Sequence, residues 1–418
     1  MTRFYALGMI LIAACGGGSI EDTDAPPTWH QDVRQIFEET CASCHTADGG
    51  ITGIPLTTYE EVLAWRGPIA AAVAAGTMPP WQAAEGCNDY QDDFSLEPKQ
   101  VQTVLDWIDA DTPEGREDSA TDPGLPWIPA TLTRVDRVIQ MPEAFTPKAS
   151  PDDYRCVIVE WPEDETVWIT GYNFIPGNLD IVHHVIPFIM TPDDAQTFRD
   201  LDEADPGVGY TCYGGPGGDI DSLIDARWLG GWAPGSGASV MPEGYGLQVE
   251  PGSVVILQVH YNLPPNNTGS DLSGLELQYE HTPLKDAEVQ PWTDVGWVLG
   301  VGMEIGPGAT DVTHEFTYKI EGDYTFELHS AALHMHTKGK SARFSISHED
   351  DTETCVVAND RWDFNWQREY WLEEPITVRQ GDTLKLSCTW DNPTDKLVRW
   401  GEGTDDEMCL AVSLMTYD

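Results

Sequence analysis

The spacing of apolar residues along the chain changes at about Pro129. Between residues 28 and 116 they recur with a helical period, as in the series Val33, Ile36, Phe37 and Cys41. After Pro129, short runs rich in β-branched and aromatic residues alternate with turns of Gly, Pro, Asn and Asp. The pattern therefore predicts a small all-α domain followed by an all-β region.

Polar residues predict where two of the N-terminal helices begin. Thr57 and Glu60 have the spacing of a capping box. Ser95 is placed to cap a further helix, whose apolar stripe would include Val104 and Ile108. The chain then becomes rich in Pro, Gly and acidic residues up to Pro129, which indicates a linker.

The β-rich region is too long for one sandwich, because such a domain holds about 100 residues and about 290 follow Pro129. We expect two all-β, jelly-roll-like sandwiches that divide between Pro283 and Pro291. No long amphipathic helix is evident there. The expected order is a helical domain over 28–116, a linker over 117–128, and sandwiches over 129–288 and 289–418.

Composition excludes one class of partner. The chain has 22 Lys and Arg against 70 Asp and Glu, a formal net charge of −48. It therefore lacks the basic surface that would displace counterions from a phosphate backbone, and nucleic acid is not an expected partner. A hydrophobic content of 41% with 16 Trp indicates a globular protein.

The first residues have the pattern of an export signal. Arg3 precedes an apolar run that is too short to span a bilayer, and Ile12-Ala-Ala-Cys15 has the form of a bacterial lipoprotein cleavage site. We expect a signal peptide over 1–15, lipidation of Cys15 and a flexible linker over 16–27. The alternative is an ordinary secretory signal that happens to end in a cysteine.

Both alternatives place the protein outside the cytosol, facing the periplasm or the cell surface, with a membrane contact only through the lipid. Disulfides are permitted there. If Cys15 is lipidated and Cys41 and Cys44 act together in their Cys-x-x-Cys-His motif, six of the nine cysteines remain. Six thiols allow fifteen pairings. These are Cys87, Cys156, Cys212, Cys355, Cys388 and Cys409.

Cys41-Ala-Ser-Cys44-His45 predicts a covalently bound haem c, because two thiols at this spacing add to the haem vinyl groups and the adjacent histidine binds iron. Met78, followed by two prolines, is a candidate second axial ligand. A thiol redox pair would need a βαβ context, and a zinc site would need a second pair of ligands. Neither is evident.

Histidines in the β-rich region predict metal binding. On a strand, residues i and i+2 share a face, so His334 and His336 can hold one metal while Met335 points away. His183 and His184 are neighbours, so they can share a metal only if a bulge or twist turns them together. Imidazole suits copper, and the thioether of a methionine such as Met408 favours Cu(I).

The N-terminal pattern with its Cys-x-x-Cys-His motif resembles a class I cytochrome c. Four later segments, in this order, resemble the copper type II, ascorbate-dependent monooxygenases. They are Leu179-Asp-Ile-Val-His-His-Val185, Leu257-Gln-Val-His-Tyr-Asn262, Leu333-His-Met-His336 and Thr404-Asp-Asp-Glu-Met-Cys409.

The second resemblance implies two copper ions on either side of a solvent-filled cleft. His183, His184 and His260 would bind the electron-transferring copper, and His334, His336 and Met408 the copper that activates O2. It also implies the disulfides Cys156–Cys212 and Cys388–Cys409, with Cys87 and Cys355 left open. Peptide-amidating members anchor their substrate with Arg and Tyr where this chain has Ala332 and Val412, so peptide amidation is not expected.

The expected function is therefore hydroxylation of a C–H bond of a small organic substrate by O2. We hypothesise that an upstream donor reduces the haem, which then reduces the copper at His183, His184 and His260. The alternative is a non-catalytic electron-transfer or copper-binding protein on the same fold. A third possibility is that the second copper acts on something other than a C–H bond.

Overall fold

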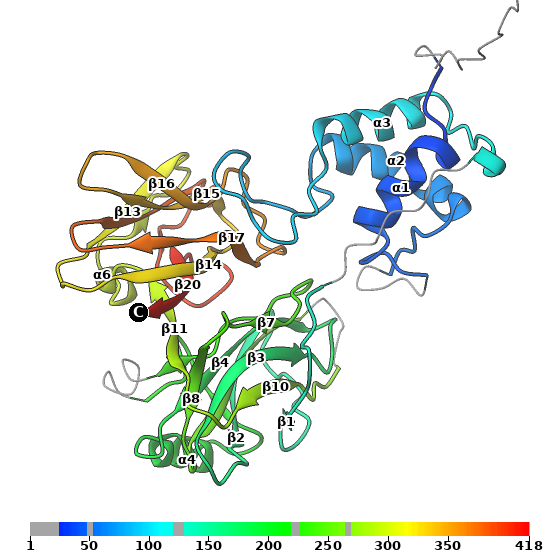
Figure 1. Ribbon diagram of the computed structural model, residues 1–418. Helices are drawn as coiled ribbons and strands as arrows, with labels where there is room; N and C mark the ends of the chain where they lie inside the picture. The colour runs from blue at the N-terminus through cyan, green and yellow to red at the C-terminus, as the bar shows by residue number, and fades with distance from the viewer. Residues whose placement is uncertain (1–24, 48–52, 120–128, 219–225, 264–268, 418) are drawn as a thin grey trace, which may run out of the picture.

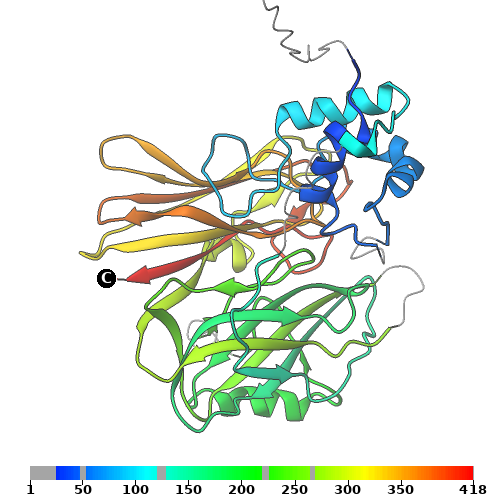
Figure 2. The same ribbon diagram turned by 45° about the vertical axis from the view of Figure 1, so that its right-hand side comes forward.

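A computed structural model describes residues 25–47, 53–119, 129–218, 226–263 and 269–417. The expected signal peptide with Cys15, and most of both expected linkers, lie outside the described residues. Among the residues that are described, no helix is both long and apolar enough to cross a membrane. Three bodies are visible in Figures 1 and 2: a helical part and two β-sandwiches.

The helical part spans residues 29–119 and has its own apolar core. Its first helix combines π-helical turns with a short α-helical segment, and two longer α-helices pack against it. The elements are η1 Trp29–Val33, α1 Arg34–Ile36, η2 Phe37–Cys41, α2 Tyr59–Ala74, α3 Pro98–Asp109 and η4 Glu117–Ser119. Val33, Ile36 and Phe37 are buried on one face, as the helical period predicts.

Both helix starts differ from the predicted ones. The capping box is formed by Thr58 and Glu61, one residue later than expected, with the Glu61 N–H donating to Thr58 Oγ1 over 3.3 Å. Helix α3 begins after Glu97 rather than Ser95, because Pro98 occupies the first helical position and its fixed φ favours that start. The Ser95 N–H instead donates to Asp93 Oδ1.

The first sandwich packs two antiparallel layers around one core. One layer has the order β1-β10-β3-β8 and the other β6-β4-β9-β2-β5. A helix that the sequence did not predict, α4 Ala195–Ala204, packs on β2 and β5. The strands are β1 Arg137–Gln140, β2 Asp152–Glu160, β3 Val167–Ile175, β4 Val182–Met190, β5 Tyr210–Thr211, β6 Arg227–Trp228, β7 Ser239–Val240, β8 Tyr245–Val249, β9 Val254–Asn262 and β10 Gly274–Glu280.

The second sandwich places the sheet β13-β18-β15-β16 against the strands β17, β14 and β20. A short pair, β12 with β19, lies beside it, and α6 Val295–Val298 follows β11. The elements are β11 Lys285–Trp292, β12 Glu304–Ile305, β13 Val312–Lys319, β14 Phe326–His334, β15 Gly339–Ser347, β16 Glu353–Asn359, β17 Glu369–Val378, β18 Thr383–Trp390, β19 Val398–Arg399 and β20 Leu410–Tyr417.

Strand β11 joins the two sandwiches. It pairs with β6 and β8 of the first and with β20 of the second. The predicted division at residues 288 and 289 therefore falls inside one continuous strand. Because hydrogen bonds run across this junction, the strands that end there have a fixed position relative to one another.

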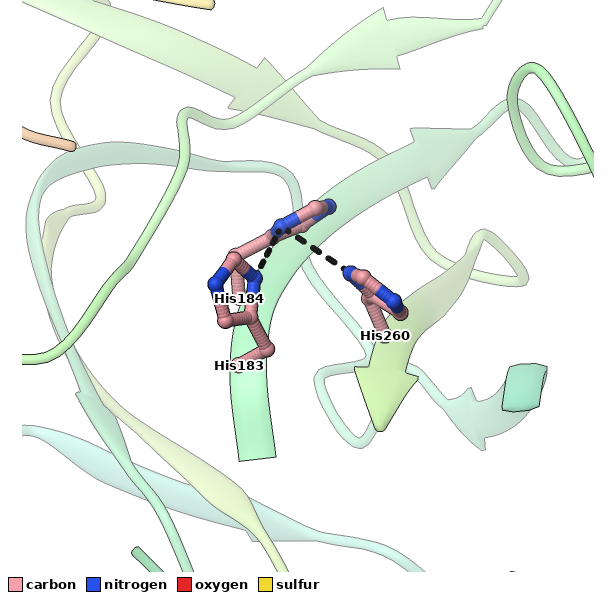
Figure 3. A group of neighbouring side chains, drawn as sticks. All are labelled: His183, His184 and His260. Atoms are coloured by element: carbon pink, nitrogen blue, oxygen red, sulfur yellow. Dashed lines mark hydrogen bonds between the residues drawn. The ribbon is translucent and has the colours of Figure 1, made fainter. Parts of the chain in front are cut away.

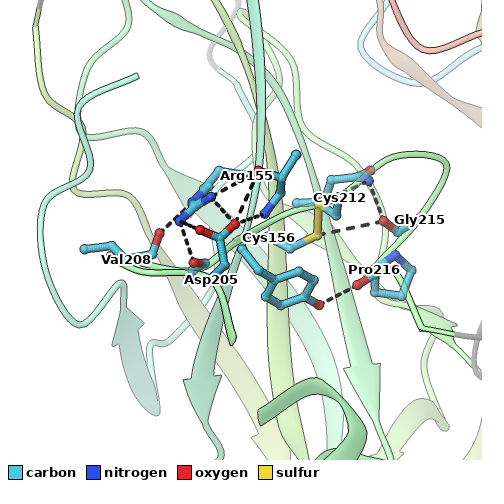
Figure 4. The surroundings of a disulfide bond; sticks show 11 residues. Arg155, Cys156, Asp205, Val208, Cys212, Gly215 and Pro216 are labelled. Carbon is cyan, nitrogen blue, oxygen red and sulfur yellow. Dashed lines mark hydrogen bonds and ion pairs between the residues drawn. A yellow bond between two sulfur atoms is a disulfide. The ribbon is translucent and has the colours of Figure 1, made fainter. Parts of the chain in front are cut away.

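Three disulfides pair six of the eight described cysteines. Cys156–Cys212 and Cys388–Cys409 are the pairs that the resemblance implies, and the third, Cys87–Cys355, joins the helical part to β16. Beside the first, the buried Arg155 side chain forms an ion pair of 2.8 Å with Asp205 and donates to two backbone carbonyls (Figure 4). These contacts fix the position of the loop that carries Cys212.

The segment between α2 and α3 attaches the helical part to the second sandwich. It forms single β-bridges from Ala83 to Asn359 and from Tyr90 to Leu372. The buried Arg368 guanidinium lies over the rings of Trp81 and Phe94, 4.9 and 4.7 Å from their centroids. A disulfide, two β-bridges and a cation–π stack therefore all join the helical part to the second sandwich.

We expect the double substitution Cys87→Ser and Cys355→Ser to loosen this attachment. The bond closes a loop of 268 residues, and removing a native disulfide typically costs about 2–4 kcal/mol through loop entropy. Scanning calorimetry should resolve an earlier transition for the helical part. The matched pair Cys388→Ser and Cys409→Ser should instead lower the transition of the second sandwich. An unchanged calorimetric profile for the first pair would contradict this assignment.

Candidate functional site

His183, His184 and His260 lie together at the end of the first sandwich that faces the second (Figure 3). His184 is the cross-strand partner of His260, and the pairing of β4 with β9 shifts register between Val182 and His184. This irregularity is what turns the adjacent His183 and His184 toward one centre. Their ligand atoms all lie within 4.8 Å of one another.

The Nδ1 atoms of the three rings converge. His184 Nδ1 is 3.2 Å from His183 Nδ1 and 3.4 Å from His260 Nδ1. On the outer side, His260 Nε2 donates to Asp152 Oδ1 over 3.0 Å. This bond fixes the tautomer, so that the lone pair of His260 lies on Nδ1 and points at the centre. The three rings thus present the donor set of an all-imidazole metal site.

Asp152 is the carboxylate that orients this set. Besides His260 it accepts hydrogen bonds from Asn262 Nδ2 and from the Thr404 hydroxyl. Despite partial burial, these bonds lower its pKa below the ordinary range. Asp180, which lies much nearer the histidine pair in sequence, is in a turn, where its N–H donates to Asn178 Oδ1. Asp152 was missed because its strand lies 108 residues from His260 in sequence.

His334, His336 and Met408 line one cavity in the second sandwich. His334 ends β14 opposite Leu410 at the start of β20, and continuing that register would place His336 opposite Met408. Met335 points the other way and is fully buried in the core, as the strand alternation predicts. The cavity therefore receives two imidazoles and a thioether from neighbouring strand ends.

Both rings of this second set are bound at their outer nitrogen. His334 Nδ1 donates to Gln367 Oε1 over 2.5 Å, and His336 Nδ1 donates to the Asp406 carbonyl over 3.3 Å. Each ring thereby directs Nε2 to the cavity. The buried Glu407 carboxyl accepts from the backbone N–H groups of His336 and Lys338. Burial raises the pKa of Glu407 to about 7.

The two histidine sets adjoin directly. The rings of His184 and His334 have centroids 5.5 Å apart. Phe364 stacks on His183 at 4.4 Å and meets His336 edge-on at 6.1 Å. The resemblance implies a solvent-filled cleft between the two sets. In this structure the rings of His184 and His334 are in contact, and both of them line one cavity.

The shared cavity beside these rings is apolar on most of its wall. Val185, Trp228, Trp232 and Leu333 line it, as do Ala332 and Val412. Two acidic side chains also reach it, Glu402 and Glu369. Burial raises the pKa of Glu402 to about 7 and also raises that of Glu369.

Cys41, Cys44, His45 and Met78 line a second, separate cavity inside the helical part. Its walls are apolar, and it holds about 1030 Å³ including open solvent at its mouth, within the range of cofactor sites. The two thiols are not joined in a disulfide. His45 Nδ1 donates to the Ile54 carbonyl over 2.9 Å, which directs Nε2 to the cavity.

These features fit haem better than a thiol redox pair. Burial raises the pKa of the Cys41 thiol to about 12 and also raises that of Cys44, whereas reactive pairs need lowered values. An apolar slot with a histidine at one wall and a methionine among its lining residues is the environment that a porphyrin requires.

His329 lies on the same strand as His334 but is not part of the site. Its Nε2 hydrogen-bonds the Thr416 hydroxyl over 2.8 Å, further along β14. Gln367 and Phe364 are site residues that the sequence analysis did not single out. They lie between β16 and β17, and no motif or spacing rule marks them individually.

We expect the five clustered rings to stay neutral in mildly acidic solution. Burial lowers the pKa of His183 to about 3 and that of His334 to about 4, and it lowers those of His184, His260 and His336. A lowered pKa keeps the neutral ring stable below the ordinary value of about 6.5. Nitrogen-15 NMR of histidine-labelled apoprotein should show no titration of these rings between pH 7.5 and 5. Midpoints near 6.5 would contradict this.

Comparison with known proteins gives a consistent result for the β-rich region. Residues 294–417 match the family model of the copper type II ascorbate-dependent monooxygenase C-terminal domain. The chain is 26% identical over 250 residues to DBH-like monooxygenase protein 1 of Gallus gallus, covering 56% of this chain and 39% of the relative. It is 29% identical over 311 residues to dopamine beta-hydroxylase of Bos taurus, covering 68% and 47%.

The rat dopamine beta-hydroxylase matches at 26% identity over 306 residues, 68% of this chain and 46% of that protein. The chain thus spans less than half the length of these relatives. Among solved structures, the VP2 subviral particle of infectious bursal disease virus aligns over 67% of this chain and 70% of its own, at 10% identity and a TM-score of 0.17. That likeness is too weak to bear on the fold. The comparisons thus find similarity to copper type II, ascorbate-dependent monooxygenases, and the match to the family model is confined to residues 294–417.

Proposed function

We propose that this protein is a copper-dependent monooxygenase that hydroxylates a C–H bond of a small organic substrate. The balanced reaction takes a substrate C–H, one O2, two electrons and two protons to an alcohol and one water. The observation that carries the proposal is the meeting of two unlike donor sets beside one cavity. One set offers three imidazoles, and the other offers two imidazoles and a thioether.

The donor atoms suit copper. Imidazole with a thioether favours Cu(I) and leaves a position for a further ligand, while three imidazoles suit exchange between both oxidation states. When bound, copper would supply one-electron chemistry and O2 activation. The protein's part is to hold the ligands, and Asp152, Gln367 and the Asp406 carbonyl do so by binding the outer nitrogen of a ring.

The cavity also favours a small substrate with an apolar reacting end. Trp228, Trp232 and Val412 contribute to its apolar wall, so an apolar C–H bond can lie next to the second donor set. Glu402, with its pKa raised to about 7, can give or take a proton at its carboxyl oxygen near neutral pH. Neither Ala332 nor Val412 has a polar side chain that could bind the carboxylate of a peptide substrate.

The helical part would hold one haem c. Cys41 and Cys44 would bind it covalently, His45 would be one axial ligand and Met78 the other. Its place beside the second sandwich, fixed by Cys87–Cys355, suits a fused electron supply for the coppers. An upstream one-electron donor would reduce it. Export and lipidation at Cys15 complete the proposal and would tether the enzyme to a bacterial membrane, facing the periplasm or the cell surface.

Substitution of Met408 tests the catalytic proposal. Purified protein should contain one haem and two copper ions per chain by metal analysis and visible spectroscopy. Met408→Ala should keep the haem and the first copper while losing about 10²–10³-fold in O2-coupled product formation, since it removes a ligand from the second set. Unchanged coupled turnover would refute the assignment. Two bound coppers with no O2 consumption in the native protein would favour a non-catalytic copper carrier.

Removal of the haem tests the electron supply. Cys41→Ala with Cys44→Ala should yield a haem-free chain with both coppers bound. We expect turnover with a protein electron donor to disappear, while turnover with a small reductant that reaches copper directly persists. Cys87 must stay paired in this variant, which a thiol count would verify. Equal turnover with the protein donor in both forms would contradict the role of the haem.

A further inference from the structure

One short turn separates the two cavities. It runs from Asp363 to Gln367, between β16 and β17. Trp366 lines the cavity that holds Cys41, Cys44 and His45, and the next residue, Gln367, lines the cavity of the histidines. Adjacent residues of one peptide thus reach into both candidate cofactor sites.

On the histidine side the link is a hydrogen bond. Gln367 Oε1 accepts from His334 Nδ1 over 2.5 Å, while Gln367 Nε2 donates to the Phe364 carbonyl over 2.9 Å. The amide is therefore held at both ends and cannot rotate freely. From the Trp366 ring to the His334 ring, the path consists of covalent bonds within two neighbouring residues and this one hydrogen bond.

The turn is clamped by the helical part. Gln82, which follows the Met78-Pro-Pro-Trp81 segment, donates from Nε2 to the carbonyls of Asp363 and Trp366 over 3.2 and 3.0 Å. Its Oε1 accepts from the Asp363 N–H over 3.2 Å. Arg361 also donates to the carbonyls of Ala75 and Gly76 at the end of α2. The loop bearing the candidate iron ligand Met78 is thus fixed to the turn.

Rigid attachment matters because electron tunnelling weakens steeply with distance. The disulfide Cys87–Cys355 and the Arg368 stack on Trp81 hold the same interface. An internal electron transfer that depended on transient docking would need none of these contacts. These contacts hold the helical part and the second sandwich in one fixed arrangement, so a path between the two cavities would be permanent.

We propose that Trp366 and Gln367 carry electrons from the haem to the copper held by His334, His336 and Met408. This inference rests on the proposed function. In the step, ferrous haem loses one electron and becomes ferric, while Cu(II) gains it and becomes Cu(I). No proton or bond is exchanged, and an external one-electron donor restores the ferrous haem. The ring contact between His184 and His334, at 5.5 Å, then connects the other copper.

This route differs from the sequence-based hypothesis, which gave the His183 set as the first acceptor. A path to that set would run through Phe364, which stacks on His183 at 4.4 Å but lies two residues from Trp366. It therefore needs more backbone bonds and a ring-to-ring step without a hydrogen bond. The contacts favour entry at His334.

Flash photoreduction of the haem in the full-length, copper-loaded protein tests the path. The decay of the ferrous haem absorbance reports electron transfer to Cu(II) without O2 or substrate. Trp366→Leu should slow this decay about tenfold, equivalent to about 1.4 kcal/mol in activation free energy. Trp366→Phe should restore most of the rate, and Phe364→Leu should leave it near the native value. Haem potentials measured for each variant allow comparison at equal driving force.

Removal of one copper at a time tests the acceptor. His183→Ala, which lacks a ligand of the first set, should still show rapid haem reoxidation by the second copper. His336→Ala should lose the rapid phase although the first copper remains. The opposite pattern, or a native rate in Trp366→Leu together with a slow Phe364→Leu, would overturn the inference in favour of entry at His183. If Trp366→Leu does not fold, this pair of variants still decides.

Haem and copper contents measured on the same samples separate the two proposals. A native chain without haem or without copper would refute the proposed function itself. A chain that binds both cofactors, turns over substrate and transfers electrons at the native rate in Trp366→Leu would refute only the route.

Discussion

Five imidazoles buried against one another are the feature on which the rest of the site depends. Burial keeps the rings neutral, since a charged imidazole in this position would have to be desolvated next to others. Three rings are oriented by an outer hydrogen bond, from His260 to Asp152, from His334 to Gln367 and from His336 to the Asp406 carbonyl. The free lone pair of His260 then points to the first donor set, and those of His334 and His336 point to the second, which is the condition for holding a metal ion in each.

The fold supplies this convergence from distant parts of the sequence. Strand β11 hydrogen-bonds to both sandwiches, so the ends of β4 and β9 and the end of β14 are fixed beside each other. Thr404 of the second sandwich bonds Asp152 of the first, which couples the two donor sets directly. The helical part attaches to the second sandwich, where Gln82 hydrogen-bonds the turn between β16 and β17. Gln367 of the same turn accepts a hydrogen bond from His334. The two candidate cofactor cavities therefore share one structural junction.

The sequence predicted the secondary structure classes and much of the local grouping of the histidines. Helical spacing identified Val33, Ile36 and Phe37 as core residues, and strand alternation placed His334 and His336 on one face with Met335 in the core. It could not find Asp152, Phe364 or Gln367, because their roles arise from contacts between segments far apart in the chain. It also misplaced two helix starts by one and two residues, since several polar residues near each start compete to cap it.

The most direct test of this account is a crystal structure of the copper-loaded protein with anomalous diffraction recorded on both sides of the copper absorption edge. The account predicts two copper peaks. One should lie among the Nδ1 atoms of His183, His184 and His260, and the other should lie between the Nε2 atoms of His334 and His336 and the Met408 sulfur. A single peak, or copper bound away from these atoms, would contradict it.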